Sequence, residues 1–90
     1  MATVAIKIKI MPEALDTNLN PIKEQGKISI EKEKGVLVRY EEQPIAFGLK
    51  ALIATLAWPE EKDTELVEQI FKKIKGVSSV DIIDYRRAIG

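Results

Sequence analysis

Apolar and polar residues alternate over residues 4–10, and this period of two predicts a strand with one buried face. Residues 36–42 and 48–58 show a looser alternation, and Pro59 ends the second of these two runs. Residues 77–86 form a fourth run of the same kind. The pattern therefore predicts four strands.

Two of the stretches between these runs have helical periodicity instead. The first helix is expected to begin after Asn18, a good capping residue, with Pro21 in the first turn, where a missing N–H costs little. Gly26 lies within its apolar stripe, and a glycine inside a helix costs up to about 1 kcal/mol. We therefore expect close packing against the sheet at Gly26. Gly35 is the expected C-terminal stop.

The second helix is the clearer one, with Asp63 or Thr64 as its cap and Gly76 at its end. Its apolar face consists of Leu66, Val67, Ile70, Phe71 and Ile74. The chain of 90 residues then has the order β-α-β-β-α-β and forms a single domain, residues 1–90. This order predicts an α+β ferredoxin-like sandwich, a four-stranded antiparallel sheet with two helices on one face.

The other face of the sheet is expected to be open. Alternation places these residues on it: Lys7, Lys9, Ala51, Ile53, Asp81, Ile83 and Tyr85. Asp84 is expected on the core-facing side, unless the last strand has already left the core at that point.

Composition narrows the range of functions. The formal net charge is zero, which argues against direct nucleic-acid binding, because phosphate neutralisation supplies most of the affinity of such proteins. The chain has no cysteine and no histidine, which removes disulfides, thiol nucleophiles and imidazole chemistry. No apolar run approaches the roughly 20 residues of a membrane span. We expect a cytoplasmic protein without a membrane contact.

Catalytic chemistry is not indicated either. Neither type of glycine-rich phosphate-binding loop is present, and the serines have no histidine to activate them. Three groups of carboxylates have the composition of acid–base pairs or magnesium ligands: Glu41 with Glu42, Glu60 and Glu61 with Asp63, and Asp81 with Asp84. Solvated charge is the favoured interpretation. We therefore expect no enzyme activity, no metal site and no cofactor.

An open sheet face makes an RNA-binding module, or a small-ligand regulatory module, the alternative function. RNA-binding domains of this topology stack bases on aromatic residues of the two central strands. The outward positions of those strands hold lysine, alanine and isoleucine here. The stacking platform is missing, so this alternative ranks below a protein-binding function.

The segment from Pro44 to Lys50 carries the strongest functional signal. Proline fixes φ, and Gly48 permits a conformation that other residues resist, so the two hold Phe47 rigidly at the tip of a hairpin. The pattern leaves two roles for Phe47 equally open: it folds back on the core, or it contacts a partner. A rigid, exposed aromatic residue is what an interface hot spot needs.

Residues 42–49, Glu-Gln-Pro-Ile-Ala-Phe-Gly-Leu, resemble the signature of archaeal elongation factor 1-beta. The eukaryotic exchange domain has the similar motif Pro-[Ile/Val]-Gly-[Phe/Tyr]-Gly-Ile-Lys-Lys-Leu, which this chain matches at Pro44, Phe47, Gly48, Lys50 and Leu52. The segments Met11-Pro12-Glu13, Gly76-Val77-Ser78 and Asp84-Tyr85-Arg86-Arg87 also fit the family. The resemblance spans essentially the whole chain.

The resemblance implies the ferredoxin-like fold and a role in translation elongation. A member of this family binds the elongation factor 1-alpha type GTPase that carries aminoacyl-tRNA and promotes exchange of GDP for GTP. The partner contacts that it implies are Pro44, Ile45, Phe47, Gly48 and Lys50.

In the eukaryotic relatives, a lysine near the C-terminus also reaches the magnesium site of the GTPase. Continuous alignment from Asp84 places that lysine at Gly90, which carries no charge. Arg86 and Arg87 are therefore the candidate cations for this role. The oligomeric state does not follow from the sequence.

Overall fold

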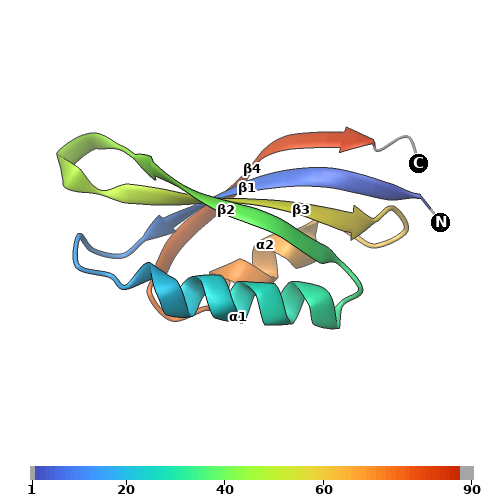
Figure 1. Ribbon diagram of the computed structural model, residues 1–90, viewed down its shortest axis with the longest axis horizontal. Helices are drawn as coiled ribbons and strands as arrows, with labels where there is room; N and C mark the ends of the chain where they lie inside the picture. Colours follow the sequence, from blue (N-terminus) through green and yellow to red (C-terminus); the bar gives the residue numbers. More distant parts are fainter. Residues whose placement is uncertain (1, 88–90) are drawn as a thin grey trace.

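The computed structural model of the chain describes residues 2–87, and its elements follow the predicted order. They are β1 (Thr3–Pro12), α1 (Leu19–Lys32), β2 (Val36–Pro44), the short 3-10 turn η1 (Ala46–Gly48), β3 (Lys50–Pro59), α2 (Glu65–Lys72) and β4 (Val77–Arg87). The strands form one antiparallel sheet in the order β2-β3-β1-β4, and both helices cover the same face of it (Figure 1). The predicted ferredoxin-like α+β sandwich is confirmed.

The core lies between the sheet and the two helices. Every second residue of β1 and β3 points into it, because successive side chains of a strand alternate between the two faces. Its buried side chains include Val4, Ile6, Ile8, Ile10, Ile22, Ile30, Leu52, Ala54, Leu56, Trp58, Val67 and Phe71. Alternation along the sequence predicted the inward face of β1 and β3 correctly.

Gly26 shows why a helix tolerates a glycine at this point. A Cβ added there would lie 2.3 Å from Phe71 Cε1 and 2.5 Å from the Tyr40 hydroxyl oxygen. The predicted close packing is therefore present, but the neighbours are helix α2 and one side chain of β2. At the start of α1, the Asn18 side chain accepts a hydrogen bond from the Asn20 backbone N–H (3.1 Å).

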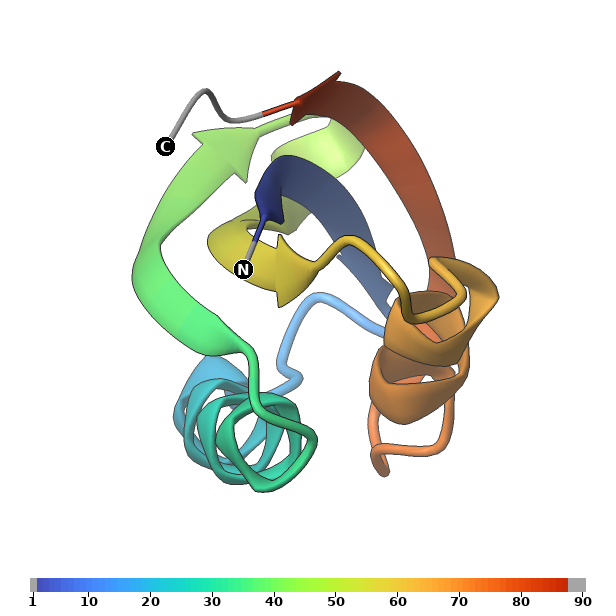
Figure 2. The same cartoon turned by 90° about the vertical axis from the view of Figure 1, so that its right-hand side faces the viewer.

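The sheet face away from the helices is only partly open, so the prediction of an open face is wrong in part. Ala51 is fully buried and Ile53 is 8% exposed, although neither points toward the helices. The sheet is strongly curved, and its edge strands bend around this face (Figure 2). Each edge strand contains a β-bulge, at Val38 in β2 and at Ile83 in β4, and bulges increase the local twist of a strand.

The bulge at Ile83 also changes two side-chain orientations. One unpaired residue reverses the alternation, because the side-chain period of a strand is two. Beyond the bulge, Asp84 lies opposite Lys7, on the face away from the helices, and Tyr85 lies opposite Ile6, on the helix face. Uninterrupted alternation predicts the reverse for both residues, and that prediction is wrong.

Candidate partner-binding site

The β2–β3 hairpin projects from one end of the molecule (Figure 1). Two backbone hydrogen bonds close its tip: the Ile45 N–H donates to the Leu49 carbonyl oxygen (2.8 Å), and the Leu49 N–H donates to the Ala46 carbonyl oxygen (3.3 Å). They fix both ends of the turn η1. The tip is therefore a defined turn with a fixed backbone path.

Phe47 lies at the centre of this turn in an unfavourable conformation. Its φ is 64° and its ψ is 27°, in the left-handed region that costs a non-glycine residue roughly 1–2 kcal/mol. Gly48 follows with a φ of 78°, which glycine adopts easily. The Phe47 side chain is 91% exposed, so it does not fold back on the core. Because backbone strain of this kind clusters at functional sites, Phe47 is the leading candidate for a partner contact.

The other predicted hairpin residues surround this aromatic ring. Pro44 and Lys50 are paired across the two strands, directly below the tip, and both are exposed. Ile45 is half-buried at the start of the turn. The structure thus brings together Pro44, Ile45, Phe47, Gly48 and Lys50, all at the free end of one hairpin.

The base of the hairpin is tied to α1. Lys23 Nζ lies 3.1 Å from Glu42 Oε2, and Glu42 Oε1 lies 3.9 Å from Lys50 Nζ. The Tyr40 hydroxyl donates a hydrogen bond to the Lys23 carbonyl oxygen (2.8 Å). Because solvent-exposed ion pairs contribute little stability, the Tyr40 bond is the firmer connection. Burial raises the pKa of the Tyr40 hydroxyl well above its ordinary value, so the hydroxyl keeps its proton into the alkaline range.

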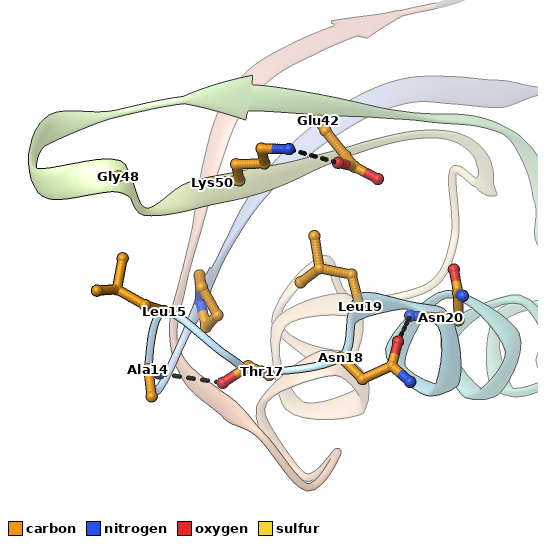
Figure 3. Close-up of a pocket in the computed structure, with 10 residues that line it drawn as sticks. Ala14, Leu15, Thr17, Asn18, Leu19, Asn20, Glu42, Gly48 and Lys50 are labelled. Atoms are coloured by element: carbon orange, nitrogen blue, oxygen red, sulfur yellow. Dashed lines mark hydrogen bonds and ion pairs between the residues drawn. The ribbon is translucent and has the colours of Figure 1, made fainter.

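A groove lies between the hairpin and the loop that joins β1 to α1 (Figure 3). Glu42, Gly48 and Lys50 line it from the hairpin, and Leu15 lines it from the loop. Leu15 is 68% exposed. The sequence analysis missed Leu15, because a single leucine in a loop carries no periodic signal.

Arg86 and Arg87 lie at the opposite end of the sheet. Arg87 pairs with Val4 near the start of β1, whereas the hairpin projects beyond the end of β1 (Figure 1). The length of β1, at about 3.3 Å per residue, separates these two ends by roughly 30 Å. The structure therefore does not bring the two arginines together with Phe47.

Both arginines have acidic neighbours and remain largely exposed. Arg86 Nε lies 3.2 Å from Asp84 Oδ2, and Arg87 Nη2 lies 2.8 Å from Glu60 Oε1. Their side chains are 79% and 77% exposed, so a binding partner can reach them. Gly90, the position aligned with the eukaryotic lysine, lies outside the described residues.

The carboxylates noted in the sequence are dispersed over the surface. Among residues 2–87, no three acidic residues are grouped so that they could hold a metal ion. Several carboxylates have a basic neighbour instead, as Glu42 has in Lys23 and Glu60 has in Arg87. In the same part of the chain, no helix is long and apolar enough to cross a membrane.

The molecule is a ferredoxin-like sandwich whose projecting hairpin presents an exposed aromatic residue with a strained backbone. Residues 5–88 match the EF-1 guanine nucleotide exchange domain, and the chain belongs to this family. Membership of the family assigns the chain to guanine nucleotide exchange, and the resemblance found in the sequence is confirmed.

Three relatives illustrate the similarity, each named Elongation factor 1-beta. The protein of Methanosarcina barkeri is 48% identical over 88 residues, which cover 97% of this chain and 99% of the relative. The protein of Sulfurisphaera tokodaii is 40% identical over 97% of both chains. The protein of Thermofilum pendens is 33% identical over 100% of both chains. The similarity therefore covers nearly the full length of each of these relatives.

Proposed function

We propose that this protein promotes exchange of GDP for GTP on an elongation factor 1-alpha type GTPase by binding the nucleotide-free form of that GTPase. Family membership supports the reaction, and the name shared by the relatives supports the partner. The observation that carries the proposal is Phe47, because a strained aromatic side chain that is 91% exposed contributes nothing to the core. The protein acts in the cytoplasm, together with the elongation machinery.

Exchange by this route needs no catalytic side chain. A factor that binds the empty GTPase more tightly than the GDP complex weakens GDP binding by the same ratio. An acceleration of about 10³-fold corresponds to a barrier lowered by about 4 kcal/mol. One well-packed hot-spot residue contributes roughly 2–4 kcal/mol to an interface. An anchor at Phe47 supplies contact energy of this order, and it accelerates release to the extent that the contact is stronger with the nucleotide-free GTPase than with the GDP complex.

The two ends of the molecule have separate tasks in this proposal. Phe47 anchors the complex, Pro44 and Gly48 hold its turn, and Ile45 and Lys50 flank it. Arg86 and Arg87, roughly 30 Å away along the sheet, are the candidates for disturbing the magnesium site. The two sets then contact different parts of the GTPase.

The test is release of a fluorescent GDP analogue from the GTPase, measured in excess unlabelled GDP with increasing amounts of this protein. The expected result is a saturable acceleration that Phe47→Ala largely removes. Ile28→Ala is the matched control, because the Ile28 side chain is 65% exposed on α1. If saturating protein does not accelerate release, the proposal is wrong. Retention on RNA at physiological salt without exchange activity would favour the RNA-binding alternative.

A further inference from the structure

Two loops present exposed apolar side chains at the hairpin end of the molecule. Leu15, in the loop between β1 and α1, is 68% exposed, and Phe47 is 91% exposed. Leu15 Cδ2 lies 3.4 Å from the point that a Cβ on Gly48 would occupy, so Leu15 reaches the residue next to Phe47. Figure 3 shows the Leu15 side chain pointing from its loop toward the hairpin at Gly48. Both apolar side chains are therefore presented at the same end of the molecule, and Leu15 lies against the residue that follows Phe47.

The backbone around Leu15 holds this side chain in its exposed position. The Ala14 N–H donates to Thr17 Oγ1 (3.0 Å), and the Thr17 N–H donates to the Ala14 carbonyl oxygen (3.2 Å), so Leu15 lies at the tip of a closed turn. The Glu13 N–H also donates to the Gly76 carbonyl oxygen (2.9 Å), which ties the loop to the segment after α2. A side chain presented in this way loses little freedom on binding, which favours affinity.

Within residues 2–87, the other large exposed apolar side chains occupy regular elements, where their exposure has a local cause. Val38 and Ile83 are the unpaired residues of the two bulges. Val36 and Tyr85 lie near the ends of edge strands, and Ile28 lies on an outward position of α1. Leu15 differs, because it lies in a loop where neither strand alternation nor helix periodicity requires an apolar residue.

We infer that Leu15 is a second anchor, which contacts the same GTPase as Phe47. The identity of the partner rests on the proposed function. A protein surface that covers Phe47 also reaches Leu15, because Leu15 touches the neighbouring position. Glu42 and Lys50 line the same groove as Leu15, so the apolar side chain is bordered by charge, as in the centre and rim of protein interfaces.

The test compares Leu15→Asn, Leu15→Met and the control Ile28→Asn in the fluorescent GDP release assay with the full chain. Leu15→Asn is expected to raise the half-saturating concentration about fivefold or more, the effect of losing an interface anchor. Leu15→Met keeps the apolar surface and stays within about twofold of the wild type. Ile28→Asn is expected to match the wild type. Thermal melts of all three variants should be unchanged, because both positions are exposed.

An unchanged half-saturating concentration for Leu15→Asn, measured while the wild type accelerates release normally, would overturn the inference and leave the proposed function intact. If the wild type does not accelerate GDP release, the proposed function is refuted, and the GTPase is refuted as the partner of Leu15 as well. Hydrogen exchange, measured on the complex with nucleotide-free GTPase, distinguishes a direct contact of Leu15 with the GTPase from a role of Leu15 in supporting the hairpin. Direct contact protects the amides of residues 13–17 on binding, and unaltered exchange there would contradict it.

Discussion

Replacing Phe47 with glycine is expected to make the protein more stable and less active. The backbone at this position has a φ of 64°, a conformation that costs a non-glycine residue roughly 1–2 kcal/mol. Glycine removes this cost, but its greater conformational freedom in the unfolded chain lowers the free energy of unfolding by about 0.4–1 kcal/mol. Because the side chain is 91% exposed, almost no packing is lost. The free energy of unfolding should therefore rise by roughly 0.5–1 kcal/mol.

Phe47→Ala is the matched control, because alanine keeps the backbone strain and removes only the ring. Its stability should equal that of the wild type within about 0.5 kcal/mol. A domain of this size gains about 4–8 °C in Tm per kcal/mol, so Phe47→Gly should melt roughly 2–8 °C above both proteins. Circular dichroism in thermal and urea denaturation measures stability, and fluorescent GDP release measures activity. Equal stability of the two variants would refute stored strain, and full exchange by Phe47→Ala would refute the anchor role.

Three further predictions concern the packing and the far end of the molecule. Gly26→Ala should lower the free energy of unfolding by about 1–3 kcal/mol in urea denaturation, because the new methyl group overlaps the Phe71 ring and the Tyr40 hydroxyl; a stabilised variant would contradict this packing. Tyr40→Phe should cost about 1 kcal/mol through loss of its hydrogen bond. Burial raises the pKa of Tyr40 in the folded state above its pKa in the unfolded chain. The stability that the protonated hydroxyl contributes is therefore complete below the unfolded-state pKa and is lost as the pH rises through the folded-state pKa. In alkaline solution, the free energy of unfolding should fall less steeply with pH for Tyr40→Phe than for the wild type. Arg86→Ala and Arg87→Ala should change stability by less than about 0.5 kcal/mol, because both ion pairs are exposed. If these arginines act at the magnesium site, the maximal exchange rate falls while the half-saturating concentration stays constant, and an unchanged maximal rate would contradict that role.

The order of elements and the inward faces of the central strands were predictable from the sequence. In β1, every second residue from Val4 to Ile10 is apolar, and only one orientation buries all of them. The β1 positions were predictable because burial on one face imposes the period of two over an uninterrupted run. In β3, Leu52, Ala54 and Leu56 face the helices as predicted, although Ala51 and Ile53 on the other face are apolar and buried as well.

The edge strands were less predictable, because a bulge has no signature in these residues. Val38 and Ile83 are ordinary β-branched residues, and an unpaired β-branched residue cannot be distinguished from a paired one by composition. The exposure of Phe47 was also undetermined, because a hairpin aromatic residue can turn toward the core or away from it. Leu15 gave no signal, since its position depends on two loops that are far apart in sequence.

The bulge at Val38 is the feature that links the fold to the site. Without it, β2 would continue its alternation from Leu37, and Tyr40 and Glu42 would both point away from the helices. With one unpaired residue, Tyr40 and Glu42 lie on the helix face instead. There the Tyr40 hydroxyl donates to the Lys23 carbonyl oxygen, and the Glu42 carboxylate pairs with the Lys23 side-chain amine. These two contacts hold the hairpin against α1. A single extra residue in an edge strand thus places both contacts with α1 on the strand that leads to Phe47.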